Sequence, residues 1–106
     1  MNEQKHLKQF AENMKMEFAV KAVSVYKNCE KLFGSSLDNA AIEQYLSLPC
    51  TTVYKNKESK LVTRFNIEND MYLMALSSDN PDTFDGLEGE YVISDIKKLI
   101  ERLGED

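Results

Sequence analysis

The chain has one histidine, two cysteines and no tryptophan, and this scarcity of reactive side chains bears first on catalysis. A Cys–His or Ser–His site needs a histidine base, and His6 lies near the start of the chain, where we expect a solvated side chain. The motifs of the nucleophile elbow, the P-loop, the dinucleotide-binding turn and the HExxH metalloproteases are absent. We therefore expect no catalytic residues and a protein that is not an enzyme.

The two cysteines, Cys29 and Cys50, have neither the number nor the spacing of a metal site, and a single histidine does not complete one. Both lie among apolar residues, which predicts two buried free thiols in a reducing compartment. A disulfide between them is an open alternative that nothing requires. We expect no metal and no cofactor.

Long hydrophobic runs are also lacking. Strictly apolar runs extend for only a few residues, so we expect no segment that spans a bilayer. The first fifteen residues have no apolar stretch of the kind that a signal peptide contains. These two absences together lead us to expect a cytoplasmic protein.

What the chain does contain is enough for one folded domain. Its 106 residues match a common domain size, and 42% of them are hydrophobic. A chain of this kind buries enough apolar surface to fold without metal or disulfide cross-links. We expect a single α+β domain over residues 1–106.

The first third of the chain shows helical periodicity. Apolar residues recur with a mean spacing of about 3.6 residues, the α-helical period; they are Leu7, Ala11, Met14, Phe18, Ala22, Val25, Cys29 and Leu32. Gly34 follows where a helix C-cap belongs. One helix of this length would reach about 42 Å, so we expect a kink or a break near residues 14–18. Residues 18–25 are rich in β-branched side chains, and a strand there is the competing interpretation.

A second helix is predicted after Ser36 or Asp38, either of which is a good N-cap, and Pro49 ends it. The period then changes to two. Residues 50–54, 61–67 and 71–76 are predicted strands, joined by turns at 56–59 and 68–70, which makes a three-stranded antiparallel meander. Within the second of these strands, one face holds Leu61, Thr63, Phe65 and Ile67. Residues 71–76 are apolar on both faces, so this strand is expected to be central or covered on both sides.

The rest of the chain reads as an acidic loop followed by a helix. Ser94 is the predicted N-cap of that helix, and Gly104 is its predicted end. Its apolar stripe consists of Ile96, Leu99, Ile100 and Leu103. The simplest architecture is an antiparallel sheet with helices packed on one face.

Charge is distributed unevenly. The net charge is −5, while residues 68–106 alone carry eleven acidic side chains against three basic ones. The candidate binding residues are the acidic ones between positions 79 and 90, namely Asp79, Asp82, Asp85, Glu88 and Glu90. They allow three interpretations: a solvated flexible loop, an interface for a basic partner, or a Ca²⁺ or Mg²⁺ site. An EF-hand loop fails, because placing Gly86 at its sixth position puts Pro81 at the first, where an oxygen ligand is needed.

A basic hairpin is the second conspicuous feature. Its cations surround the turn at 56–59; they are Lys55, Lys57, Lys60 and Arg64. Protection of an exposed sheet edge is the favoured interpretation. Binding of single-stranded nucleic acid, with Tyr54 and Phe65 as stacking platforms, is a weaker one. Attraction to the acidic loop is a third. The overall negative charge disfavours direct binding to nucleic acid.

The function that these patterns favour is binding. Acidic side chains on a rigid scaffold steer association with a basic surface and imitate nucleic-acid phosphates. We expect an inhibitor, an immunity protein or a phage-type counter-defence protein that occupies a basic surface of a partner such as a nucleic-acid-binding enzyme. The alternative is a homo-oligomeric accessory or structural protein that assembles through the N-terminal helix. In that case Leu7, Phe10, Met14 and Phe18 would contact a second copy rather than the core.

Overall fold

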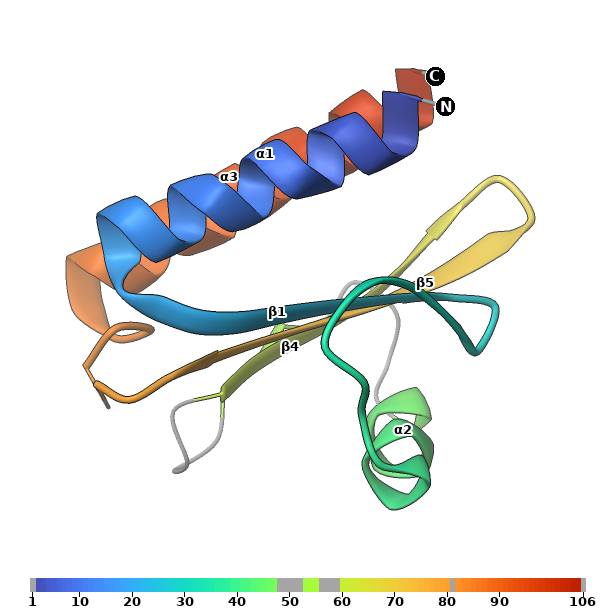
Figure 1. Ribbon diagram of the computed structural model, residues 1–106, viewed down its shortest axis with the longest axis horizontal. Helices are drawn as coiled ribbons and strands as arrows, with labels where there is room; N and C mark the ends of the chain where they lie inside the picture. Colours follow the sequence, from blue (N-terminus) through green and yellow to red (C-terminus); the bar gives the residue numbers. More distant parts are fainter. Residues whose placement is uncertain (1, 48–52, 56–59, 81, 106) are drawn as a thin grey trace.

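The computed structural model describes residues 2–47, 53–55, 60–80 and 82–105. These residues form three helices and five strands. In chain order they are α1 (Asn2–Phe18), β1 (Val20–Lys27), β2 (Glu30–Gly34), α2 (Asn39–Leu46), β3 (Val53–Lys55), β4 (Lys60–Ile67), β5 (Asp70–Ser78) and α3 (Gly86–Glu105). The strands form one antiparallel sheet in the order β2-β1-β5-β4-β3 (Figure 1). The predicted α+β class is confirmed.

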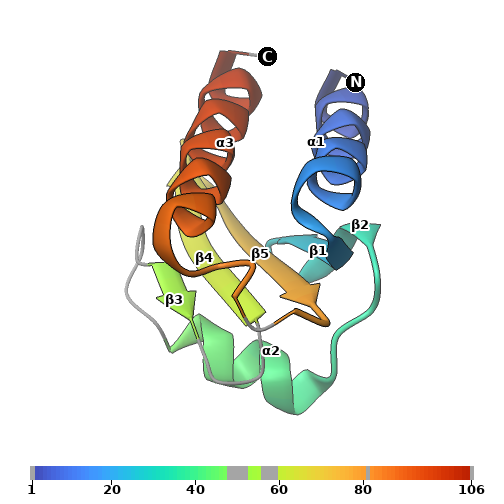
Figure 2. The same ribbon diagram turned by 90° about the vertical axis from the view of Figure 1, so that its left-hand side faces the viewer.

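The helices lie on both faces of the sheet. α1 and α3 pack side by side and run in opposite directions over one face, so the two chain ends lie close together (Figures 1 and 2). α2 lies on the other face (Figure 2). The prediction of helices on a single face is therefore wrong for α2. Among the described helices, none is long and apolar enough to cross a membrane.

The predicted long N-terminal helix ends early. α1 stops at Phe18, Ala19 has a positive φ of 55°, and the chain continues as strand β1. The competing interpretation of a strand is confirmed, with the bounds Val20–Lys27. Both faces of β1 are buried, so apolar side chains occupy positions that fit either period. β-Branched residues at positions 20, 23 and 25 favour the strand.

Two residues that were predicted to belong to that helix, Cys29 and Gly34, lie in other elements. Gly34 ends β2 with φ at 87°, where a Cβ atom would lie 1.8 Å from the carbonyl oxygen of Val23. It is required by this close approach of two chains and not as a helix cap. Cys29 lies exposed in the turn between β1 and β2 with a free thiol, so the prediction of a buried thiol is wrong for it. Cys50 lies outside the described residues.

The meander is confirmed for β3, β4 and β5, although β1 and β2 extend the sheet beyond the three predicted strands. β5 is central, between β1 and β4, and is buried on both faces as predicted. Leu61, Thr63 and Phe65 are buried on the face that α1 and α3 cover, as their alternation indicated. The turn at 68–69 is present, with Glu68 at φ 56°. The turn predicted at 56–59 lies outside the described residues.

Each face of the sheet has its own apolar cluster. The larger cluster lies under α1 and α3 and includes Leu7, Phe10 and Met14, with Phe18 partly buried against it. These α1 side chains therefore pack in the core of their own chain, as one of the two interpretations had it. The smaller cluster lies under α2 and includes Tyr26, Tyr45, Val62, Leu73 and Ala75.

The third helix begins eight residues before its predicted N-cap. α3 starts at Gly86, so Ser94 lies inside it, and the helix runs past Gly104 to Glu105. The predicted stripe is confirmed for Ile96, Leu99 and Leu103, which are buried. α2 begins after Asp38, as one of the two predicted N-caps required, but the Asp38 side chain makes no capping hydrogen bond.

Candidate functional site

The five predicted binding carboxylates lie on two short turns and the start of α3. Asp79 follows β5 directly, Asp82 and Asp85 lie in the turn, and Glu88 and Glu90 lie in the first turns of α3. All five side chains are exposed. The predicted loop therefore covers only the first part of the segment, and α3 forms the rest.

Buried residues anchor this acidic segment to the sheet. Thr83 and Phe84 are 1% and 3% exposed. The Ser78 and Thr83 hydroxyl groups share a hydrogen bond of 2.9 Å, and Ser78 Oγ also donates to the carbonyl oxygen of Ala19 at 3.1 Å. The amide of Asn80 donates to Ser78 Oγ at 3.1 Å. These contacts fix the backbone that presents the carboxylates outward.

The turn itself is closed by local hydrogen bonds. The amide of Asp82 donates to Asn80 Oδ1 at 3.0 Å, and the amide of Asp85 donates to the carbonyl oxygen of Asp82 at 3.1 Å. Asp85 directly precedes α3, and its carbonyl oxygen accepts the amide of Gly89 at 3.2 Å, the first helical hydrogen bond. The acidic side chains stand near the start of α3, at the positive end of its dipole.

Most of this negative charge is not neutralised within the chain. Asp79 lies 3.4 Å from Lys21 Nζ, but both side chains are largely exposed, so the pair adds little stability. Among the described residues, Asp82, Asp85 and Glu88 take part in no ion pair, and the same holds for Glu90. Their charge is therefore available to a partner.

Two large apolar side chains lie exposed among these carboxylates. Leu87 is 64% exposed and Tyr91 is 55% exposed, and they stand one helical turn apart on α3. Neither was predicted as a binding residue, because Leu87 lies in the predicted loop and Tyr91 lies between it and the predicted N-cap Ser94. Their spacing of four is the signal that an earlier helix start would have supplied. Asp82, Asp85, Leu87, Glu88, Glu90 and Tyr91 are called the acidic–apolar surface below.

A third exposed apolar residue lies at the same end of the helical layer. Met16, near the end of α1, is 85% exposed. Because α1 and α3 run in opposite directions, the end of α1 lies beside the start of α3 (Figures 1 and 2).

The basic hairpin does not form a comparable surface. β4 lies between β5 and β3, but among the described residues β3 pairs only with residues 61–63, so Lys60 and Arg64 flank the paired stretch and edge protection stays a prediction. Arg64 donates to the carbonyl oxygen of Leu46 at 2.7 Å and so holds the C-terminal end of α2. Its Nε also lies 3.3 Å from the Met71 sulfur. The side chain of Lys55 and the whole of Lys57 lie outside the described part of the chain.

The remaining polar cluster joins the start of α1 to the sheet. The Tyr72 hydroxyl donates to Glu3 Oε2 at 2.6 Å. Lys27 Nζ lies 3.7 Å from carboxylate oxygens of both Glu3 and Asp70, and 5.8 Å from the centre of the Tyr72 ring. Burial, together with the hydrogen bond to Glu3 and the nearby negative charges, raises the pKa of Tyr72 above its ordinary value. His6 is half-buried in a groove between α1 and α3.

Comparison with known proteins does not assign the chain to a group: no protein-family model, no curated protein and no solved structure matches it. Within the described residues, no group of three or more histidine, cysteine, aspartate or glutamate side chains is arranged to hold a metal ion.

Proposed function

We propose that this protein is a non-enzymatic protein-binding module that occupies a basic surface of its partner through the acidic–apolar surface. The observation that carries this proposal is the exposure of Leu87 and Tyr91 amid carboxylates that are not paired within the described residues. An inhibitor, an immunity protein or a phage-type counter-defence protein works in this way. A partner that normally binds nucleic-acid phosphates, such as a nucleic-acid-binding enzyme, has the complementary charge.

The arrangement of side chains supports a protein partner. Stable interfaces commonly have an apolar or aromatic centre, in which tyrosine is enriched, and a polar rim. Leu87 and Tyr91 supply such a centre, and the four carboxylates of the surface supply the rim. Charges of one sign on a rim mainly accelerate association and make it sensitive to salt.

The test is a tagged pull-down from a lysate of the source cells or of their host, at low and at high salt, analysed by mass spectrometry. Three variants accompany the wild type. One removes the apolar centre (Leu87→Ala with Tyr91→Ala), and one removes the rim charge (Asp82→Asn, Asp85→Asn, Glu88→Gln and Glu90→Gln). The matched control, Glu101→Gln with Glu105→Gln, removes exposed charge from the opposite end of α3.

We expect one stoichiometric partner that high salt and the first two variants remove and that the control retains. Thermal melts of each variant must show a folded protein, because losing carboxylates near the start of a helix costs about 0.3–1 kcal/mol each. Recovery of the same partner by all four proteins would refute the assignment of this surface.

Assembly through the N-terminal helix remains the alternative. Leu7, Phe10 and Met14 are buried in their own chain, so among the described residues Met16 is the large apolar side chain that α1 exposes. Sedimentation of the wild type and of Met16→Glu distinguishes the two: an oligomer that this substitution converts to a monomer supports assembly.

A further inference from the structure

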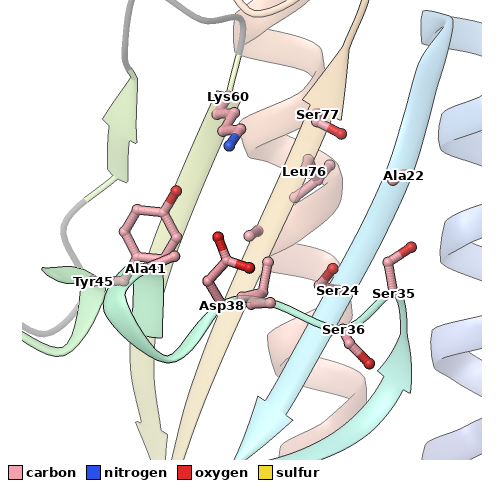
Figure 3. A pocket seen from close by; sticks show the side chains of 12 residues that line it. Ala22, Ser24, Ser35, Ser36, Asp38, Ala41, Tyr45, Lys60, Leu76 and Ser77 are labelled. Carbon is pink, nitrogen blue, oxygen red and sulfur yellow. The ribbon is translucent and has the colours of Figure 1, made fainter. Parts of the chain in front are cut away.

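A second site lies on the opposite side of the sheet, under α2. A pocket of about 240 Å³ opens between α2, the segment 35–38 and strands β1 and β5 (Figure 3). Its floor consists of small side chains on paired positions, Ala22 opposite Ser77 and Ser24 opposite Ala75. Because these side chains are short, they do not fill the space beneath the helix.

The helix above this floor is held at both ends, so it cannot settle into the space. At its start, the amide of Leu37 donates to the Tyr26 hydroxyl at 2.9 Å, and the amide of Ser35 donates to the carbonyl oxygen of Val23 at 3.2 Å. At its end, Arg64 holds the carbonyl oxygen of Leu46. The pocket is therefore built into the fold.

Two largely buried residues present hydroxyl groups to the pocket. Ser24 and Tyr45 are 3% and 5% exposed, and both line the pocket. Neither hydroxyl makes a hydrogen bond to another residue in the part of the chain that the structure describes. Both hydroxyl oxygens are accessible, and they face the space of the pocket (Figure 3). Because both oxygens open onto the pocket, each hydroxyl group can bond with water or with a molecule bound there.

Opposite charges face each other across the same space. Asp38 stands at the N-cap position of α2, yet its carboxylate does not cap that helix. It points into the pocket, and the Lys60 side chain points toward it from β4 (Figure 3). Three further serine hydroxyl groups line the walls, and Leu37 and Ala41 add apolar surface.

We propose that this pocket binds a small zwitterion, a free α-amino acid with a small apolar side chain. The Asp38 carboxylate accepts hydrogen bonds from the ligand ammonium group. The Lys60 ammonium and the Tyr45 hydroxyl donate to the ligand carboxylate, which is a charge-assisted pairing. The apolar side chain lies against Leu37 and Ala41. The volume is below the range of about 300–1,000 Å³ typical of sites for drug-sized ligands, and so suits a ligand of this size.

The proposal is independent of the acidic–apolar surface, which lies on the other side of the sheet. Its test is a calorimetric titration of the chain with each of the common L-amino acids. Three probes isolate the parts of the ligand: isobutylamine has only the ammonium group, isovalerate has only the carboxylate, and inorganic phosphate is an anion without an apolar part.

We expect saturable binding of a small apolar amino acid, with each probe weaker by about tenfold or more, because each lacks a charge-assisted contact. Asp38→Asn keeps a good N-cap residue and Lys60→Met keeps the aliphatic stem, and thermal melts must show that both variants are folded. Each should weaken amino-acid binding by about tenfold or more. Ser24→Ala should weaken it as well.

The controls are Glu43→Gln on the exposed side of α2 and Lys97→Met on the exposed side of α3, neither of which lines the pocket. Both should bind like the wild type. Absence of binding by every amino acid, binding of phosphate as tight as that of the amino acid, or equal affinity of the Asp38 and Lys60 variants and the wild type would each overturn the proposal.

Discussion

At the scale of single residues, two glycines show how backbone conformation and space combine. Gly34 and Gly86 both have positive φ, at 87° and 59°. A Cβ at position 34 would lie 1.8 Å from the Val23 carbonyl oxygen, whereas one at position 86 would meet nothing within 4 Å. A side chain at either position would therefore have an unfavourable φ, but only a side chain at position 34 would also clash with the backbone.

This difference predicts unequal effects of the same substitution. Gly86→Ala should lower the free energy of unfolding by about 1 kcal/mol, from the unfavourable φ alone. Gly34→Ala should lower it by about 3 kcal/mol or more, because the sheet must also shift. Urea denaturation of both variants measures the losses. Equal losses would show that the close approach to Val23 is absent in solution.

Tyr72 is the residue at which pH acts on stability. Its pKa is raised in the folded protein, chiefly by burial and then by the hydrogen bond to Glu3. A tyrosine whose pKa is raised by folding contributes stability that is complete below the ordinary value of 10.0 and is lost as the pH rises beyond it.

We therefore expect the wild type to lose stability above pH 10 more steeply than Tyr72→Phe. At neutral pH the variant should be less stable by about 1 kcal/mol, the usual contribution of such a hydrogen bond. Chemical denaturation from pH 8 to about pH 11 measures the free energy of unfolding of both proteins. Other tyrosines and lysines titrate in both proteins, so their effect cancels in the difference between the two free energies. A difference that does not change with pH would contradict the raised pKa.

At the scale of elements, the turn between β1 and β2 explains a failure of prediction. Asn28 and Cys29 have φ values of 51° and 70°, the pattern of the mirror-image two-residue hairpin turn. Asn28 is well suited to it, and its side chain also bonds with Asp70 and the Met71 amide. Cysteine is rarely found in this conformation, so nothing in the sequence marked position 29 as a turn.

This turn leads to a prediction that Cys29→Gly stabilises the protein. Glycine adopts the positive φ without strain, and the pair Asn-Gly is the favoured one in such hairpins. We expect a gain of about 0.5–1 kcal/mol in the free energy of unfolding. Lys31→Gly, an exposed strand position on the same hairpin, is the matched control and should destabilise. A loss of stability in both variants would argue against this turn type.

The other elements show where periodicity suffices and where it does not. β4 alternates because one of its faces lies under the two long helices while the other is buried only around Val62, and residues 71–76 of β5 are apolar because both of its faces are covered. Both were predictable. β1 is also buried on both faces, and in so short a stretch its apolar residues fit a helical spacing as well. The start of α3 was missed because Gly86, Gly89 and the acidic side chains resemble a loop, although Phe84 is anchored in the core.

The pocket under α2 arises from pairing between β1 and β5, which are far apart in sequence, and a single sequence does not show such pairing.

At the scale of the whole molecule, the sheet separates two surfaces of different chemistry. The helical layer of α1 and α3 carries the acidic–apolar surface, and the α2 side carries the pocket (Figures 1, 2 and 3). The net charge of −5 acts over the whole surface, but the carboxylates at the start of α3 add a local field around Leu87 and Tyr91. Long-range attraction and short-range apolar contact should therefore affect different rate constants of partner binding.

This separation gives a kinetic prediction for the partner recovered by the pull-down. Neutralising Asp82, Asp85, Glu88 and Glu90 should slow association by about tenfold at low salt and by much less at high salt, since salt already screens these charges. Leu87→Ala with Tyr91→Ala should leave association nearly unchanged and accelerate dissociation, because the apolar contact forms only after the partners have docked. Surface plasmon resonance at two salt concentrations measures both rate constants. If the charge variant changed only dissociation, the carboxylates would be acting in direct contacts rather than by steering, and the rim assigned to them would belong to the centre of the interface.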